Sequence, residues 1–442
     1  MKSISIYIHI PFCVKKCQYC DFLSAPADSR AQEVYLRALK QEIREQAARY
    51  REYEVQTVFI GGGTPTAVPC GNLCEVLKTV FSFYRMNPHA EISMEANPGT
   101  VTKEALLSYR KAGINRISIG LQSADDMELK LLGRIHTYRD FQQTYRWAQE
   151  VGFTNINLDI MSALPGQSVE NYKKTLETVL SLKPQHISAY SLIVEEGTPF
   201  YEKYGQESEK LQATGEKQPD LPSEEEEREM YALTEKLLAA AGYHRYEISN
   251  YALPGRECRH NLVYWKRGNY VGFGLGAASM VENVRFENIR EMQEYLAEYA
   301  CMPDAEPVFA EVAQGDVQVL SNKQEFSLRE DTHSENQQEL SLREDTHSEN
   351  EQELSIRENV HPLSPQEQME ETMFLGLRLT EGVSKAEFHR QFGVSMEQIY
   401  GEVIRKNTAK GLLIDEAGYV CLTREGMDLS NYVMAQFLLD EV

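Results

Sequence analysis

Three cysteines near the start of the chain have the types and spacing best suited to chemistry. Cys13, Cys17 and Cys20 form a C-x3-C-x2-C pattern directly after an apolar run. Thiolates are the usual ligands of iron-sulfur clusters, and three of them can hold three irons of a 4Fe-4S cube while the fourth iron stays open. A zinc site completed by His9 is the main alternative, but structural zinc needs four ligands and no second C-x2-C follows. The pattern therefore predicts a 4Fe-4S cluster.

An open iron can be chelated by the amino and carboxylate groups of S-adenosylmethionine. One electron from the reduced cluster then splits a carbon-sulfur bond and yields a 5'-deoxyadenosyl radical, so the cofactor carries the difficult chemistry. The glycines at 61–63 would let the backbone approach such a ligand, and Glu95 could pair with its cationic end. The groups that could bind its carboxylate and ribose hydroxyls are Gln122, Arg134 and Asp159. Taken singly, these residues also fit a tight turn, a surface arginine and a helix cap.

The first 200 residues alternate short β-branched runs with longer amphipathic stretches, which is typical of repeated βα units. Six such units favour an α/β fold with a partial (β/α)6 TIM-like barrel, and a doubly wound sheet is the alternative. In both folds ligands collect at the carboxyl ends of the strands, where the cysteines, the glycines and the polar residues all fall. The predicted strands are Ser5–Ile10, Thr57–Ile60, Glu91–Glu95, Arg116–Gly120, Asn155–Ile160 and His186–Ile193.

Charge and hydropathy exclude some classes of protein. The formal net charge of -22 disfavours nucleic-acid binding, which needs a basic face. No apolar run approaches the roughly 20 residues of a transmembrane helix, so we expect no transmembrane segment and a cytoplasmic protein. The eight cysteines show no disulfide framework, which predicts reduced thiols.

Several motifs resemble those of the radical SAM superfamily, within the group of oxygen-independent coproporphyrinogen III oxidase. The motifs are YIHIPFC, GGGTPT, EANPGT, SIGLQS, GRIHT and NLDIMSALPGQS. The resemblance implies cluster ligation by the three cysteines and an electron donor such as flavodoxin or ferredoxin. It also implies cofactor contacts at Tyr7, Tyr19, Gly62, Gly63, Thr64, Glu95, Gln122, Arg134, Asp159 and Ser191.

Two departures separate the chain from the oxidase pattern. Phe22 stands where the oxidase pattern has a fourth cysteine, and the segment from His260 to Trp265 reads HNxxYW. The second motif resembles haem chaperones of the HemW type. That resemblance implies haem binding by His260, Asn261, Tyr264 and Trp265, and an imidazole is a good axial ligand for haem iron. From the residues alone, a capped turn with a hydrogen-bonded His260 and two core aromatic residues is the favoured explanation of the motif, and it is the resemblance that favours haem binding instead.

Four segments follow from the patterning. Residues 1–205 are the predicted radical SAM partial barrel, and 206–300 a barrel extension that carries HNxxYW and a strand at YEISNYA. Residues 301–361 are a predicted acidic linker, in which 14 residues from 327 are repeated almost unchanged up to 354. Residues 362–442 read as helix, helix and hairpin, which predicts a small α+β, winged-helix-like C-terminal domain.

The predicted function is that of a haem chaperone that binds a 4Fe-4S cluster, S-adenosylmethionine and haem, and transfers haem to an unidentified acceptor protein. The first alternative is radical decarboxylation of coproporphyrinogen III to protoporphyrinogen IX. The second is a related radical SAM methyltransferase or haem-modifying enzyme, so the sequence leaves enzyme activity open.

Overall fold

The computed structural model describes residues 1–205, 219–299 and 357–439. The 14-residue repeat and most of the predicted linker lie outside the described residues. Residues 357–361, at the end of that predicted linker, belong to strand β12 (Arg357–Pro362). No helix in the described ranges has the length and apolar character needed to span a membrane.

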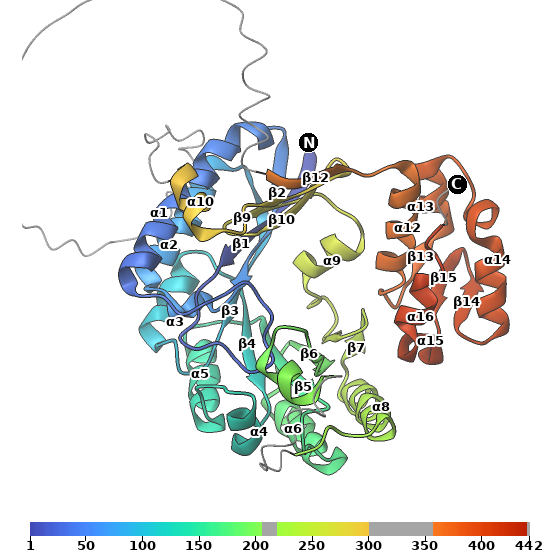
Figure 1. The fold of residues 1–442 in the computed structure, drawn as a ribbon, viewed down its shortest axis with the longest axis horizontal. Coiled ribbons are helices and arrows are strands. Elements are labelled where there is room, and N and C mark those ends of the chain that lie inside the picture. Colours follow the sequence, from blue (N-terminus) through green and yellow to red (C-terminus); the bar gives the residue numbers. More distant parts are fainter. Residues whose placement is uncertain (206–218, 300–356, 440–442) are drawn as a thin grey trace, which may run out of the picture.

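Six parallel strands in sequence order form the body of the molecule, as the sequence predicts (Figure 1). They are β1 (Lys2–Ile10), β2 (Tyr53–Gly62), β3 (Met86–Ala96), β4 (Arg116–Gln122), β5 (Ile156–Ser162) and β6 (His186–Ser191). The connecting helices are α1 (Ser29–Gln46), α2 (Cys70–Phe83), α3 (Lys103–Lys111), α4 (Asp126–Leu131), α5 (Tyr138–Glu150) and α6 (Val169–Leu182). Short 3-10 turns follow α1 and β2 at Ala47–Tyr50 and Pro65–Ala67.

The sheet stays open, so the barrel is partial. Its order is β12-β11-β10-β9-β1-β2-β3-β4-β5-β6-β8-β7, and the two ends are not paired with each other. Beyond β1, strand β9 (Tyr270–Phe273) is parallel, and β10 (Ala278–Val281), β11 (Val284–Asn288) and β12 are antiparallel. Beyond β6 lie the antiparallel strands β8 (Asn250–Ala252) and β7 (His244–Arg245).

The predicted strand at YEISNYA is wrong over its first four residues, 246–249. Only residues 250–252 pair as β8, because the chain turns between β7 and β8. The Arg245 guanidinium holds this turn by donating hydrogen bonds to the carbonyl oxygens of Glu247 and Ile248. Local side-chain bonding to the backbone thus prevails over the β-branched pattern.

Helix starts follow ordinary capping rules. Ser223 closes a capping box with Glu226 at the start of α8 (Glu224–Ala240), and the four acids of the first turn suit the positive end of the helix dipole. The remaining barrel helices are α7 (Pro199–Tyr204), α9 (Arg259–Trp265) and α10 (Met292–Tyr299). Figure 1 shows α9 between the barrel and the C-terminal domain, while α1, α2 and α3 cover the outer face of the strands.

The C-terminal domain has its own core, formed among others by Met373, Phe388, Tyr400 and Phe437. The predicted hairpin is present as β14 (Leu413–Glu416) and β15 (Tyr419–Leu422), joined by β13 (Val383–Ser384). The structure has more helices than predicted: α12 (Pro365–Gly376), α13 (Lys385–Phe392), α14 (Met396–Ala409), α15 (Arg424–Asp428) and α16 (Ser430–Ala435).

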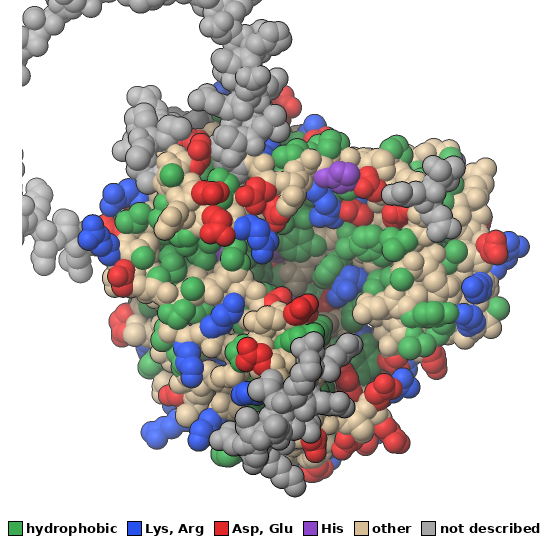
Figure 2. Space-filling view, viewed as in Figure 1, with side chains coloured by type: hydrophobic (Ala, Val, Ile, Leu, Met, Phe, Trp, Pro, Cys, Tyr) green, Lys and Arg blue, Asp and Glu red, His purple; other side chains and the backbone are tan. Residues whose placement is uncertain are grey.

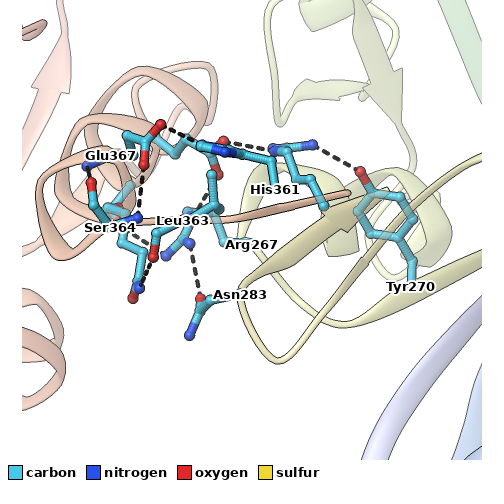
Figure 3. A network of polar contacts seen from close by, with 11 residues as sticks. Arg267, Tyr270, Asn283, His361, Leu363, Ser364 and Glu367 are labelled. Carbon is cyan, nitrogen blue, oxygen red and sulfur yellow. Dashed lines mark hydrogen bonds and ion pairs between the residues drawn. The ribbon is translucent and has the colours of Figure 1, made fainter. Parts of the chain in front are cut away.

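A buried ion-pair cluster joins this domain to the sheet extension. The two carboxylate oxygens of Glu371 on α12 lie 3.1 Å from Arg267 Nε and 2.7 Å from Arg285 Nε. The same arginines reach Asn283 and the Tyr270 hydroxyl, so the cluster spans α12, the loop after α9 and the strands β9 to β11 (Figure 3). Only 4% of the Arg267 side chain is exposed. One carboxylate therefore pairs with two partly or wholly desolvated guanidinium groups and offsets one of their two charges.

Replacement of this carboxylate should destabilise the protein strongly. In Glu371→Gln the charge is lost while Arg267 stays buried, and breaking one side of a buried pair costs about 3–5 kcal/mol. Urea unfolding should show this loss of free energy. Glu381→Gln is the matched control, because Glu381 pairs with Lys266 at the exposed surface and should contribute below about 1 kcal/mol. Equal free energies of unfolding in the two variants would contradict a stabilising role of the Glu371 ion pairs.

Candidate functional site

A cavity of about 600 Å3 lies inside the open barrel. This volume is within the usual range for cofactor and small-molecule sites. Viewed from the side of Figure 2, the surface is hollowed between the barrel and the C-terminal domain, and hydrophobic side chains gather around the hollow. The strands contribute Tyr7, Phe59, Glu95, Arg116, Ser118, Gly120, Gln122, Asn157, Asp159, Met161, Ser188 and Tyr190 to its lining.

The period of the strands explains this lining. On β4 the cavity is lined by residues 116, 118, 120 and 122, while Ile117, Ile119 and Leu121 are buried on the other face. Successive side chains of a strand alternate between its two faces, so polar residues at every second position fill the lumen and apolar ones pack against the helices. The strand pattern thus makes a polar interior within an apolar shell.

The cysteine loop is held against the glycine turn after β2. Gly63 N donates to Ile10 O at 2.9 Å and Thr64 N to Phe12 O at 2.7 Å. A β-carbon on Gly63 would lie 2.7 Å from Phe12 O, which explains why this position has no side chain. The turn therefore fixes the backbone immediately before Cys13.

Two side chains tie the loop to neighbouring strands. Thr64 Oγ1 lies 3.5 Å from Cys13 Sγ, and Arg134 Nη1 lies 3.7 Å from Cys17 Sγ. Asn97 joins them, since its amide donates to Thr64 Oγ1 at 2.7 Å and its oxygen accepts from Arg134 Nη2 at 2.6 Å. Asn97 was not among the residues selected from the sequence.

The three thiols fit a cluster that takes one thiolate per iron. Burial raises the pKa of Cys20 to about 11, and the neighbouring Cys17 and Cys13 add to this effect. Thiols placed so close together resist joint ionisation, and a bound cationic iron centre relieves that repulsion. Within the described ranges no three His, Cys, Asp or Glu side chains are grouped to hold one metal ion. A cube does not require such convergence on a single ion.

Two buried carboxyl groups lie deeper in the cavity. Burial raises the pKa of Glu95 to about 8, with a further contribution from Asp159, although Gly62 N donates to Glu95 Oε2 at 3.2 Å. Burial also raises the pKa of Asp159, despite hydrogen bonds from Ser118 and Asn157. Gln122, on the strand between those of Glu95 and Asp159, accepts from the Tyr190 hydroxyl at 3.0 Å. The site thus offers acids that a cationic ligand would help to ionise.

The raised pKa of Glu95 has a consequence for stability. Below about pH 4.5 the side chain is protonated in both states, whereas between about 4.5 and 8 only the folded state keeps the proton. Its contribution to the free energy of unfolding therefore falls as pH rises through this window. Urea unfolding of ligand-free protein at pH 6 and pH 9 should show a smaller fall in Glu95→Gln than in the parent. Glu104→Gln, which removes an exposed carboxylate on α3, is the control; an unchanged fall in Glu95→Gln would contradict the argument.

His260 forms part of the cavity wall and uses both ring nitrogens. Its Nδ1 lies 2.6 Å from Thr57 Oγ1 and its Nε2 2.8 Å from the Tyr264 hydroxyl. Burial lowers its pKa to about 3, so the ring is neutral. Thr57 donates onward to Ser5, which leaves His260 Nδ1 as the donor and Nε2 as the acceptor from Tyr264. An iron ion could therefore bind Nε2 only after displacing the Tyr264 hydroxyl.

The cavity brings together nearly all the residues selected from the sequence. The lining includes the three cysteines and Tyr7, Tyr19, Gly62, Gly63, Thr64, Glu95, Gln122, Arg134, Asp159, Ser191, His260, Asn261 and Tyr264. Trp265 is not part of the lining. It is half-buried at the junction with the C-terminal domain, where the Arg378 guanidinium lies 4.3 Å from its ring centroid.

Several cavity residues escaped selection from the sequence, and Arg116, Asn157 and Ser188 are the main examples. Arg116 and Asn157 occupy the first inward positions of β4 and β5, and Ser188 on β6 lies opposite Asp159. The available signal was the alternation of each predicted strand, continued backwards from Gln122, Asp159 and Tyr190.

Comparisons with known proteins agree with this architecture. Residues 7–179 match the Radical SAM superfamily, and residues 363–429 match the HemN C-terminal domain. The chain is 34% identical over 435 residues to the heme chaperone HemW of Bacillus subtilis, covering 98% of this chain and 99% of the relative. It is 39% identical over 282 residues to that of Escherichia coli, covering 64% and 71%. The chain belongs to the HemW family.

The solved structure of coproporphyrinogen III oxidase (HemN) from Escherichia coli shares the fold of this HemW family member. The TM-score is 0.74 at 21% identity, with 99% of this chain and 90% of the oxidase covered. Membership of the radical SAM superfamily implies a 4Fe-4S cluster and S-adenosylmethionine. The three thiols of the cysteine loop and the polar lumen are chemically suited to both groups.

Proposed function

We propose that the protein is a cytoplasmic haem chaperone that binds haem and hands it to an acceptor protein. The observations that carry this proposal are the 34% identity to the heme chaperone HemW of Bacillus subtilis, which covers 98% of this chain, and Phe22 at the position of the oxidase's fourth cysteine. Haem is the cargo here, while the cluster and S-adenosylmethionine are resident. An electron donor such as flavodoxin or ferredoxin would serve the cluster.

Residues of the mouth and of the deeper cavity would hold the resident groups. Cys13, Cys17 and Cys20 would bind the cluster, with Arg134 and Thr64 orienting the loop. Glu95 would pair with the cationic part of S-adenosylmethionine and lose its proton on binding. Gln122 and Asp159 would accept hydrogen bonds from the hydroxyl groups of the cofactor. When bound, the cluster and S-adenosylmethionine together can supply one-electron cleavage of a carbon-sulfur bond.

The segment at His260, Asn261, Tyr264 and Trp265 would serve the cargo. His260 and Tyr264 line the cavity beside Phe59, whose ring stacks on the imidazole at 5.2 Å between centroids. An aromatic wall suits a flat apolar ring. Trp265 would act from the junction with the C-terminal domain, where it holds the end of α9 against Arg378.

A haem titration followed by a turnover assay decides between this function and the oxidase alternative, which remains because the chain shares the fold of HemN. Anaerobic protein with a reconstituted cluster is titrated with haem and then incubated with coproporphyrinogen III, S-adenosylmethionine and a reductant. Stoichiometric haem binding without decarboxylated product supports the chaperone. Formation of protoporphyrinogen IX would instead show that the protein is an oxidase. Consumption of haem would show that it is a haem-modifying enzyme.

His260→Ala should weaken haem binding roughly tenfold to a hundredfold, because it removes the axial ligand that Tyr264 screens in the free protein. Absorbance titration measures the affinity, and iron analysis checks that the cluster is intact. His389→Ala, at an exposed histidine of α13, is the control. Unchanged affinity in His260→Ala would move the iron ligand elsewhere, for example to Cys258.

A further inference from the structure

Arg116 is a fully buried cation inside the cavity. Its side chain is 2% exposed, and it lies at the first residue of β4, in the inward row with Ser118, Gly120 and Gln122. Its Nε has no hydrogen-bond partner, and the described residues make no hydrogen bond or ion pair with the guanidinium. A buried charge without a bonded partner is costly, so such a group is usually kept for a ligand.

The surroundings keep this guanidinium charged without using its hydrogen-bonding capacity. Burial lowers the pKa of Arg116, but the nearby Cys258, Glu91 and Asp159 raise it on balance. The oxygens of Glu91 are engaged by the backbone N–H groups of Arg259 and His260 at the start of α9. Those of Asp159 accept from Ser118 and Asn157. The acids near Arg116 therefore balance its charge without a bonded contact, and the residue itself lines the cavity.

The cavity has a second arginine at its other end. Arg134 contacts Cys17 at the mouth, and its Nη2 donates to Gly120 O at 2.9 Å. Arg116 precedes Gln122 by six residues on β4, which corresponds to about 20 Å along a strand. A carboxylate that binds the open iron must lie near the cysteines at the mouth. A carboxylate that Arg116 binds must therefore be a different group from the one that binds the open iron.

We propose that Arg116 is the carboxylate-binding residue of the cavity floor and receives a propionate of the haem cargo. Haem combines a flat apolar ring with two carboxylates at one edge, and the wall above Arg116 carries Phe59, His260 and Tyr264. The planar fork of a guanidinium binds a carboxylate through two parallel hydrogen bonds. The inference rests on the proposed function, because it assigns one end of the same cargo.

The test compares haem with its dimethyl ester, in which both propionates are blocked. Anaerobic, cluster-loaded protein is titrated with each compound in the parent and in Arg116→Gln. In Arg116→Gln the affinity for haem should fall roughly tenfold to a hundredfold, because a charge-assisted bidentate contact is lost. The ester should bind the parent as weakly as haem binds the variant, and Arg116→Gln should leave the ester affinity unchanged.

Three controls keep the outcome decisive. Arg116→Lys retains the charge without the planar fork and should give an intermediate haem affinity. It also provides the test if Arg116→Gln fails to fold. Arg259→Gln removes an exposed arginine of α9 and should leave both affinities unchanged. S-adenosylmethionine affinity is measured in every variant, and its loss with unchanged haem affinity would assign the carboxylate to that cofactor and overturn the proposal.

The remaining outcomes separate this inference from the proposed function. Equal weakening of haem and ester in Arg116→Gln would show that Arg116 only supports the cavity, and the inference fails while the chaperone function stands. If the parent binds neither compound, the proposed function fails and the inference falls with it.

Discussion

Cys17→Ser should abolish the iron-sulfur cluster. Serine places a weakly acidic hydroxyl where the cube needs a thiolate, and Cys17 is the proposed ligand beside the Arg134 guanidinium. All three cysteines lie in one loop, and after the loss of one ligand only two thiolates remain. Two thiolates are too few to retain the cube once solvent reaches the iron that has lost its ligand. Iron and sulfide content after anaerobic reconstitution should fall close to zero, and the broad visible absorbance should disappear.

Cys70→Ser is the matched control for this variant. Cys70 is a free, half-buried thiol at the start of α2 and does not line the cavity. Its replacement should leave iron content and absorbance at the level of the parent. Iron content retained in Cys17→Ser and lost in Cys70→Ser would refute the assignment of the ligands.

Gly63→Ala should have the second largest effect. The added β-carbon would lie 2.7 Å from Phe12 O and 3.0 Å from Ile10 O, so the backbone of one segment must shift. The hydrogen bonds that Gly63 N and Thr64 N make to the chain before Cys13 would then be strained or lost. We expect S-adenosylmethionine affinity and cluster occupancy to fall at least roughly tenfold, which corresponds to about 1.4 kcal/mol.

Gly71→Ala separates this close approach from a general effect of glycine replacement. Gly71 lies in the first turn of α2, and a β-carbon there meets no atom within 4 Å. Alanine favours the helix by up to about 1 kcal/mol, so the variant should be at least as stable as the parent. Equilibrium binding of S-adenosylmethionine and iron analysis provide the readout. Normal binding in Gly63→Ala would show that the cysteine loop does not depend on the glycine turn.

The sequence alone determined the strands and the mouth of the site. Each of the six βα strands is anchored by a β-branched run, and the motif residues follow those runs at the carboxyl ends. Parallel strands in one sheet bring these ends to one edge whatever the details of packing. That rule explains why sixteen of the seventeen selected residues line one cavity. The exception, Trp265, lies one residue after Tyr264 on α9, and residues so close on a helix face different sides.

The tertiary structure alone decided the floor of the site and its attachments. From its sequence Arg116 is an ordinary charged residue at the start of a strand, and only the packing of neighbouring segments around it makes it a buried cation that lines the cavity. The hydrogen bonds of His260 depend on Thr57, which is more than 200 residues away in sequence. The pairing of Glu371 with two arginines likewise depends on how α12 docks. Periodicity is local and can be read along the chain, whereas burial and partnership arise from contacts between distant segments that no local pattern encodes.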